Sequence, residues 1–427
     1  MRYTVAAAGG APAAAGRILQ IGANLKNGEG DFRRDFGGIT SLELDLLNLA
    51  AGVFAADRGT ARGEREDYSR ELELTVPVVN VARLLPLLPQ IESILRLLSD
   101  DVWTLQLRQA AGEPEDQFLL TDPQSRTLLF SGGLDSCAAA IEFGAGANPL
   151  QLVSHRTRNQ VTDTAQRQLV QQLSGSGYNV QHHQYFVSST DGGPTPFDHD
   201  AENSQRTRSF MFLVLGALVA RRTGAFEIMY LAENGQMAIH LPLTTARIGA
   251  FSTHTAHPSV VVAMERFLRA ALEAPIRIEN PYLYRTKREV AEVVSSALPA
   301  AVADTTSCWR NARLPVGVTH CGDCIPCQIR RIALEFTGTD PTRYARNLWV
   351  EPVGQLGPDD SGRRNVVELS EFIYRFRTES DESLMSAFPE LLSEDFDGAA
   401  AIGMYRRFAG EAYSVLTRYP ALGGLLA

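Results

Sequence analysis

The sequence lacks the long apolar segments of membrane and secreted proteins. Its longest strongly apolar run, 210–220, is about half of the roughly 20 residues that a membrane-spanning helix requires, so it predicts a buried helix. The alanine-rich start is interrupted by Gly9, Gly10 and Pro12 and has no unbroken apolar core of the kind found in signal peptides. These two absences predict a cytoplasmic protein.

Positive charge is also scarce. The chain has 40 Lys and Arg residues against 49 Asp and Glu residues, which gives a formal net charge of -9 at pH 7. An acidic chain has no general electrostatic attraction to nucleic acid. The balance therefore favours a small-molecule or protein substrate over a nucleic acid.

Cysteine is rare and clustered. Only five cysteines occur among 427 residues, and four of them lie within 308–327, which is too local for a disulfide scaffold. The C-x12-C-x2-C-x2-C spacing lets four thiolates face one tetrahedral ion and leaves no open coordination position. We therefore predict a structural zinc site rather than unpaired buried cysteines. Its predicted ligands are Cys308, Cys321, Cys324 and Cys327, whereas the fifth cysteine, Cys137, is expected to serve packing.

The length allows two or three domains, and the sequence pattern divides the chain into three regions. An α+β domain of unassigned role is expected at 1–122, a catalytic α/β domain with the zinc site at 123–340, and a helical extension at 341–427. No internal repeat is evident.

The first region combines strand and helix patterns. Residues 70–76 alternate with period two, and 81–98 carry a helical apolar stripe. Further strands are predicted at 103–107 and 117–120, with a turn between them. This region contains no motif that assigns a function.

Strands and helices alternate in the middle region. The alternation implies a parallel sheet with helices on both faces. Ligands of such sheets bind at the carboxyl ends of the strands. Strands are predicted at 127–130, 150–154, 179–187 and 226–231, and helices at 161–173 and 204–222.

A glycine-rich turn follows the first of these strands and opens a helix. Two glycines there let the backbone approach a polyphosphate, whose charge meets the amide groups and dipole of the helix start. Asp135 is expected to orient the turn or to help hold Mg²⁺. For an isolated Gly-Gly pair, an ordinary turn with a serine cap would be the better interpretation. The predicted phosphate-binding residues are Ser131, Gly132, Gly133, Leu134, Asp135 and Ser136.

The full hexapeptide distinguishes this turn from an ordinary one. It resembles the SGGxDS signature of the PP-loop ATP pyrophosphatases, which cleave ATP between its α and β phosphates to adenylate a substrate. The chain has no Walker-type Gly-Lys-Ser/Thr motif, which argues against γ-phosphate chemistry at this turn. The resemblance implies a Rossmann-like PP-loop fold and the use of ATP with Mg²⁺.

The turn and the cysteine cluster, in this order, resemble the 7-cyano-7-deazaguanine synthases, the QueC family of queuosine biosynthesis. The family has a PP-loop near its start and Cys, then Cys-Gly-x-Cys-x-x-Cys, near its end, matched here by Cys308 and 321–327. Its members adenylate the carboxylate of 7-carboxy-7-deazaguanine with ATP and let an amine attack the activated acyl group. The resemblance covers 126–338.

Weaker matches keep the order of the family and add candidate site residues. Arg208, before an apolar helix, is expected to neutralise phosphate charge. Glu233 lies at a strand end where the family places ligand contacts, and it is expected at the nucleotide site. Lys287, at a helix start, is expected to stabilise charge on the transferring phosphate. Together with Asp135, Arg208 and Lys287 form the predicted catalytic set.

The chain is larger than a synthase of the queuosine pathway, and its first cysteine gap is longer than usual. In this it resembles the enlarged QueC-like proteins of bacterial anti-phage operons, including the Qat system and type IV CBASS. That resemblance implies transfer of the deazaguanine acyl group to an amine at the terminus of a partner protein encoded nearby. The N-terminal region is then expected to serve homodimerisation or partner capture.

Other functions stay open on the sequence alone. Ammonia as the amine would give 7-cyano-7-deazaguanine, as in queuosine-type biosynthesis. A PP-loop tRNA-modifying enzyme would use the same adenylation on a nucleobase, and a non-catalytic scaffold would only bind nucleotide and a partner. His254 and His257 are either substrate-binding or base groups or incidental histidines of a loop before a helix.

Overall fold

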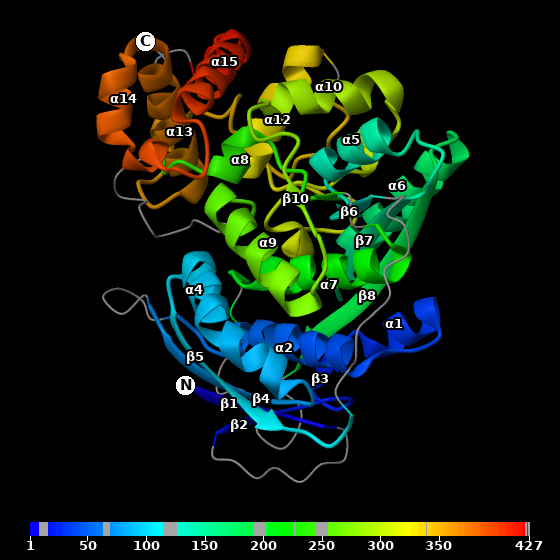
Figure 1. Cartoon of the computed structure of the whole chain (residues 1–427). Helices are drawn as coiled ribbons and strands as arrows, with labels where there is room; N and C mark the ends of the chain where they lie inside the picture. Colours follow the sequence, from blue (N-terminus) through cyan, green and yellow to red (C-terminus); the bar gives the residue numbers. More distant parts are fainter. Residues whose placement is uncertain are drawn as a thin grey trace.

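Two sheets organise the chain, which is described here by a computed structural model (Figure 1). A six-stranded sheet carries the glycine turn, and the N-terminal region builds a four-stranded sheet. No helix within the described segments is long and apolar enough to cross a membrane. The structure describes residues 1–7, 16–62, 69–113, 126–190, 202, 204–225, 228–243, 255–338, 340–422 and 425.

The larger sheet has the strand order β10-β9-β6-β7-β8-β3. Neighbours pair in parallel from β10 to β8, and β3 joins β8 in the antiparallel direction. The predicted parallel α/β sheet is confirmed. Its strands are β3 (Leu25–Asn27), β6 (Thr127–Leu129), β7 (Leu150–Arg156), β8 (Val180–Ser189), β9 (Met229–Tyr230) and β10 (Ile278–Glu279).

Helices cover both faces of this sheet, because alternate residues of its central strands point to opposite sides. Leu128 and Phe130 pack into one hydrophobic cluster with α5, α6 and α10, whereas Leu129 packs into another with α7 and α9 (Figure 1). Burial on both faces explains why the strand is apolar without alternation. The helices of this region are α5 (Leu134–Phe143), α6 (Gln160–Gly175), α7 (Arg208–Thr223), α8 (Gly235–Ile239), α9 (Pro258–Leu272), α10 (Lys287–Ala297), α11 (Ala301–Asp304) and α12 (Ile325–Thr337).

The N-terminal region forms the second sheet, in which every neighbouring pair is parallel, in the order β2-β1-β4-β5. Helix α2 lies between this sheet and α7 (Figure 1). It is buried at nearly every position from Leu42 to Asp57, as expected for a helix packed between two layers. The elements are β1 (Arg2–Ala6), β2 (Arg17–Gln20), α1 (Glu29–Phe36), α2 (Ser41–Arg58), β4 (Glu71–Val78), α3 (Val81–Leu84), α4 (Leu88–Ser99) and β5 (Val102–Gln109).

The two sheets share one hydrophobic core, and the N-terminal region also supplies β3 to the edge of the larger sheet. The strand predicted at 103–107 is β5, which pairs in parallel with β4 along its whole length. The strand predicted at 117–120 lies outside the described residues. The division expected at residue 122 also falls in this gap and stays a prediction.

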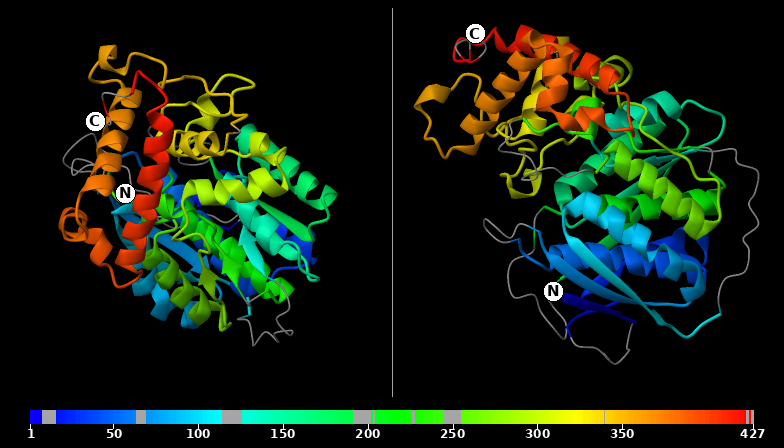
Figure 2. Two further views of the ribbon diagram at one scale, coloured as in Figure 1. Left: turned by 90° about the horizontal axis from the view of Figure 1, so that it is seen from above. Right: turned by 60° about the vertical axis from the view of Figure 1, so that its left-hand side comes forward.

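The end of the chain is helical, as the sequence predicts. Its helices pack against α8 and α12, on the far side of the larger sheet from the N-terminal sheet (Figure 2). The core between them is aromatic: the ring centroids of Phe372 and Phe376 are 4.6 Å apart, and those of Phe376 and Tyr405 are 5.0 Å apart. The helices are α13 (Ser361–Thr378), α14 (Asp381–Ala387) and α15 (Gly398–Leu416).

Candidate active site

The predicted phosphate turn connects β6 to α5 at the carboxyl edge of the larger sheet. Gly132 has a φ of 80°, in the left-handed region that favours glycine. A Cβ atom on Gly133 would lie 3.1 Å from Ser131 Oγ and 3.2 Å from the carbonyl oxygen of Thr306. Side chains at these two positions would crowd the start of α5, so the glycines leave space there for an anion.

Two serine hydroxyls close the turn. The backbone N–H of Gly133 donates to Ser131 Oγ (3.2 Å), and Ser136 Oγ donates to the carbonyl oxygen of Gly133 (3.1 Å). The two hydroxyl oxygens are 3.3 Å apart. Ser131 is exposed whereas Ser136 is buried, so Ser131 is the hydroxyl that a ligand reaches first.

Asp135 is buried in the first turn of α5 and joins residues from two distant elements. Lys287 Nζ, at the start of α10, lies 2.9 Å from both carboxylate oxygens, and Asn234 Nδ2 donates at 2.9 Å. Burial opposes ionisation of Asp135, but the charge of Lys287 and these hydrogen bonds outweigh it and lower the pKa of Asp135. The structure thus brings together two of the three residues predicted as catalytic.

Glu233 lies beside Asp135, and its pKa is shifted in the opposite direction. Its backbone is held at the end of β9 by Asn280, whose side chain bonds to the N–H (3.2 Å) and the carbonyl oxygen (2.8 Å) of Glu233. Burial and repulsion by Asp135 raise the pKa of Glu233 well above its ordinary value, although Lys287 acts against them. A proton shared by the two carboxyl groups therefore resides on Glu233.

Arg208 opens α7 at the same edge of the sheet and contacts a different set of residues. Its Nε donates to His155 Nδ1 (3.2 Å), while His155 Nε2 lies 2.8 Å from the carbonyl oxygen of Val187. Burial, together with the charge of Arg208, lowers the pKa of His155 to about 3, so the ring is neutral and carries its proton on Nε2. Among the described residues, no hydrogen bond or ion pair joins Arg208 to Asp135 or Lys287.

The four clustered cysteines converge on one point. Their Sγ atoms all lie within 4.8 Å of one another, and those of Cys321 and Cys327 are 3.8 Å apart. Two sulfurs bound at about 2.3 Å to a tetrahedral ion stand about 3.8 Å apart, so the donor set fits zinc. All four cysteines are buried, which suits a structural ion.

The cysteine cluster also supports the phosphate turn. Just before Cys308, the N–H of Thr306 donates to the carbonyl oxygen of Gly132 (3.0 Å). Asn311 Nδ2 donates to Thr306 Oγ1 (2.9 Å), and Asn311 Oδ1 accepts from Asn159 Nδ2 (2.8 Å). A metal bound by the cysteines would therefore fix one wall of the turn.

The chain is similar in sequence to known proteins of one family. A family profile described as "Queuosine biosynthesis protein QueC" matches residues 207–338. A 7-cyano-7-deazaguanine synthase of Agrobacterium fabrum (strain C58) is 28% identical over 239 residues, which cover 52% of this chain and 93% of the relative. Another, of Porphyromonas gingivalis (strain ATCC 33277), is 31% identical over 173 residues, which cover 38% of this chain and 68% of the relative. The chain belongs to the QueC family.

Membership of the QueC family makes the chain an enzyme of the PP-loop kind, a group that uses ATP to form C–N bonds. The profile match contains Arg208, Glu233, Lys287 and the four cysteines. The phosphate turn and His155 precede it. The turn and His155 therefore lie in the part of the middle region that the profile does not cover.

Some residues of the site are not singled out by the sequence of this QueC-family enzyme. His155 lies inside a strand and Gln166 inside a helix, so no local pattern marks them. Asn234 belongs to the strand end at 233–235 that the family resemblance marks for ligand contacts, but nothing in the sequence indicates its hydrogen bond to Asp135. Lys287 has a stronger signal, because the chain contains only one other lysine, Lys26, and uses arginine for its remaining cations.

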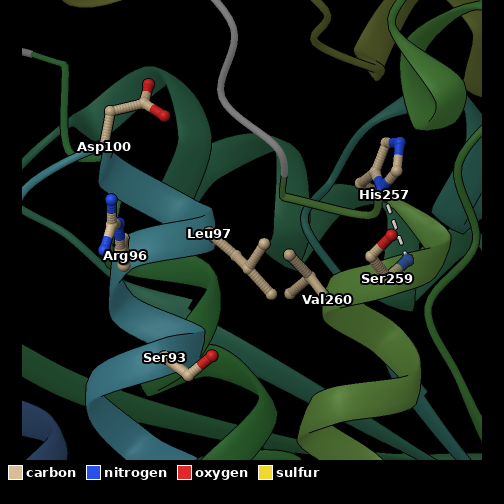
Figure 3. Close-up of a pocket in the computed structure, with 7 residues that line it drawn as sticks. All are labelled: Ser93, Arg96, Leu97, Asp100, His257, Ser259 and Val260. Atoms are coloured by element: carbon tan, nitrogen blue, oxygen red, sulfur yellow. Dashed lines mark hydrogen bonds between the residues drawn. The ribbon is translucent and has the colours of Figure 1, made fainter. Parts of the chain in front are cut away.

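Of the two histidines considered from the sequence, the structure describes His257. His254 is outside the described residues. His257 caps α9, accepting a hydrogen bond from the N–H of Ser259 (3.3 Å, Figure 3). It borders a cavity of ≈ 300 Å³ that no residue of the phosphate turn lines, which favours a structural role. The lining residues are Ser93, Arg96, Leu97, Asp100, His257, Ser259 and Val260.

Proposed function

We propose that this QueC-family enzyme adenylates the carboxylate of 7-carboxy-7-deazaguanine and transfers the acyl group to the N-terminal amine of a partner protein, in anti-phage defence. The observation that carries the proposal is the buried Lys287–Asp135 ion pair (2.9 Å) behind the glycine turn. A fixed cation beside an anion-binding helix start suits a reaction in which negative charge develops on a phosphate.

Two displacements make up the proposed reaction. A carboxylate oxygen attacks the α-phosphorus of ATP, the bond to the bridging oxygen of the β-phosphate breaks, and pyrophosphate leaves. The amine nitrogen then attacks the acyl carbon, the C–O bond to AMP breaks, and the nitrogen loses a proton to water. The turn would hold the pyrophosphate that leaves, and Lys287 and Arg208 would offset the developing charge.

Asp135 has an orienting role in this proposal. Its oxygens bind Lys287 and Asn234, and the neighbouring Glu233 holds its proton. Mg²⁺ would accompany the nucleotide, with ligands that include phosphate oxygens and water.

A protein acceptor is supported by the surface next to the turn. Thr306, which is bonded to the turn, lies two residues before Cys308. The segment between Cys308 and Cys321 exposes Trp309 (51%) and all of Val316. Exposed aromatic and apolar side chains are typical of surfaces that contact other proteins. The regions on either side of the profile match add further surface for a partner.

Intact-mass spectrometry tests this function. The purified enzyme would be incubated with ATP, Mg²⁺ and 7-carboxy-7-deazaguanine, with ammonia in one reaction and with proteins encoded beside it in another. We expect a partner to gain the mass of the deazaguanine acyl group. Formation of the nitrile from ammonia alone would instead assign 7-cyano-7-deazaguanine synthesis, and the absence of either product would point to another PP-loop substrate such as tRNA.

The chain's two lysines provide a matched pair of variants for the same assay. Lys287→Ala should reduce pyrophosphate release by about 100-fold or more, because a fixed charge next to the reacting phosphate is lost. Lys26→Ala should have no effect, since the Lys26 side chain is exposed on β3 and donates to the carbonyl oxygen of Gly22 (2.6 Å). Equal activity of the two variants would contradict the role given to Lys287.

A further inference from the structure

Arg208 and Arg58, from separate elements, lie close to His155 at the carboxyl edge of β7, and Arg158 lies close enough to Arg58 for their charges to interact. Arg208 donates to the ring of His155 (3.2 Å). Arg58, the last residue of α2, lies with its guanidinium carbon 5.9 Å from the ring centre of Phe54, and that ring meets His155 edge-on at 5.5 Å. Arg158 is exposed in the loop after β7. The N-terminal region therefore reaches the site through the end of α2.

The positive charges of this cluster act on one another. Burial and the charge of Arg158 lower the pKa of Arg58, and burial lowers the pKa of Arg208. The charges of Arg208 and Arg58 both lower the pKa of His155, whose ring therefore stays neutral. A site with this concentration of positive charge attracts anions.

The carboxylates nearby do not neutralise the cluster. The carboxylate of Asp57, which precedes Arg58, partly opposes the lowering of the Arg58 pKa. Its oxygens, however, accept hydrogen bonds from Arg70 (2.5 Å) and from the N–H of Thr207, the residue that caps α7 (3.0 Å). Within the described ranges, no carboxylate forms an ion pair with Arg58, Arg158 or Arg208. Arg58 Nε is buried and has no hydrogen-bond partner in the part of the chain that the structure describes. An oxyanion would supply the missing acceptors.

The arginine cluster adjoins the phosphate turn. Strands β6 and β7 are neighbours, and the turn follows β6. Gln166 Nε2 lies 3.3 Å from the carbonyl oxygen of Ser131 and 3.5 Å from that of His155, so one amide connects the two groups. A polyphosphate seated on the turn would thus have these cations beside it.

We propose that Arg58, Arg158 and Arg208 form a subsite for phosphate groups next to the turn, and that the N-terminal region completes it with Arg58. The inference rests on the ATP-dependent activation proposed above. Arg58 and Arg158 lie outside the 207–338 profile match. The same chemistry would bind the phosphates of ATP or the released pyrophosphate, because guanidinium groups pair with the oxygens of both.

Calorimetric titration of the full chain in Mg²⁺ with ATP, and separately with inorganic pyrophosphate, tests the subsite and its occupant. Arg58→Gln and Arg158→Gln should each weaken binding about tenfold, as expected for loss of a charge-assisted hydrogen bond. Weaker ATP binding assigns the subsite to the nucleotide, and weaker pyrophosphate binding alone assigns it to the product. Arg58→Lys should restore part of the affinity, because it keeps the charge.

Arg33→Gln is the matched control, since Arg33 also belongs to the N-terminal region but is exposed and pairs with Glu29 (2.8 Å). Arg158→Gln decides the question if Arg58→Gln does not fold, because Arg158 is exposed. The subsite is overturned if the folded arginine variants bind both ligands as Arg33→Gln does. A wild-type enzyme that shows no ATP–pyrophosphate exchange with 7-carboxy-7-deazaguanine would overturn the proposed function instead, and pyrophosphate titration would still test the subsite.

Discussion

Two buried carboxylates from opposite ends of the chain hold the two helix starts that carry the proposed catalytic cations. Asp57, in the N-terminal region, accepts hydrogen bonds from the N–H and the hydroxyl of Thr207, one residue before Arg208 (both 3.0 Å). Glu411, in the C-terminal region, accepts from the hydroxyl of Thr286, one residue before Lys287 (3.0 Å). Both carboxylates accept a threonine hydroxyl, yet they are paired to different extents.

Both carboxylate oxygens of Asp57 are bonded within a buried charge network. Arg70 bonds to Asp57 (2.5 Å) and Asp101 (2.6 Å), and Arg62 also pairs with Asp101 (2.8 Å). These side chains are almost completely buried. A buried charge network of this kind is strongly destabilised when one member is removed, because the partner charge stays in the interior. The N-terminal contact with α7 is therefore rigid.

Glu411 is less completely paired. Arg288 Nε donates to Oε1 (2.9 Å), but Oε2 is buried and has no hydrogen-bond partner within the described structure. Burial raises the pKa of Glu411 despite the opposing effect of Arg288. The C-terminal region therefore holds Lys287 through a carboxylate with one unpartnered oxygen and a raised pKa, whereas both oxygens of Asp57 are bonded.

Loss of the metal should have the largest effect on stability, because it removes the attachment of the C-terminal region to the cysteine cluster. The contacts of Glu411 itself are left unchanged. The chain beyond α12 is bonded to the cysteine cluster through Arg346 N–H and the Cys321 carbonyl oxygen (3.1 Å). Cys321→Ser should remove bound zinc and much of the roughly 10 kcal/mol that a structural zinc site contributes. Elemental analysis and thermal unfolding measure both outcomes.

Cys137→Ala is the control for this variant. Cys137 is buried in α5, where burial raises its pKa to about 12, and it lies apart from the metal-binding cluster. The Cys137→Ala protein should therefore retain the full zinc content. A Cys321→Ser protein with unchanged zinc and unfolding temperature would show that the cluster does not hold the C-terminal region.

Asp57→Ala should have the next largest effect. Removal of the carboxylate leaves Arg70 buried with one partner fewer and leaves Thr207 without its acceptor, so we expect a loss of about 3–5 kcal/mol in the free energy of unfolding. Urea denaturation measures it. Asp57→Asn keeps the shape and one acceptor and should lose less. If Asp57→Ala costs no more than an exposed substitution, the network is not the rigid anchor inferred here.

The local parts of the fold and site could be predicted from the sequence. The parallel sheet follows from alternating apolar strands and helices, and the turn at 131–136 and the cysteine spacing are contiguous signals. Helix α7 illustrates the limit of such signals. The helix predicted from the sequence starts at residue 204, but the observed helix begins at Arg208, after Thr207 binds Asp57. That boundary is set by a residue 150 positions away.

The long-range contacts could not be predicted for the same reason. Nothing in the periodicity of α2 indicates that it is buried against a second sheet as well as against α7. Similarly, Gly322 is recognisable as part of the cysteine motif, but the reason for a glycine there lies in the docked C-terminal region, because a Cβ atom at this position would collide with the carbonyl oxygen of Arg346. Residues such as Asp57, His155 and Glu411 acquire their roles only when distant elements meet.

Glu411→Gln should have the smallest effect and the clearest pH dependence. A raised pKa means that the folded state binds this proton more tightly than the unfolded state does. The contribution of Glu411 to stability is therefore fully present below the ordinary glutamate pKa and declines as pH rises through the higher, folded-state pKa. Glutamine cannot ionise, so the variant should lack this decline.

Urea denaturation of the wild type and of Glu411→Gln, from below the ordinary glutamate pKa to above the raised pKa of Glu411, measures the difference in the free energy of unfolding. At the low end of this pH range the free energies of unfolding of the two proteins should agree to about 1 kcal/mol, because glutamine keeps an acceptor for Thr286 and loses only a hydrogen bond of ordinary strength. As pH rises, the wild type should lose stability relative to Glu411→Gln. Parallel pH profiles would mean that Glu411 is as firmly paired as Asp57, and the contrast between the two ends of the chain would disappear.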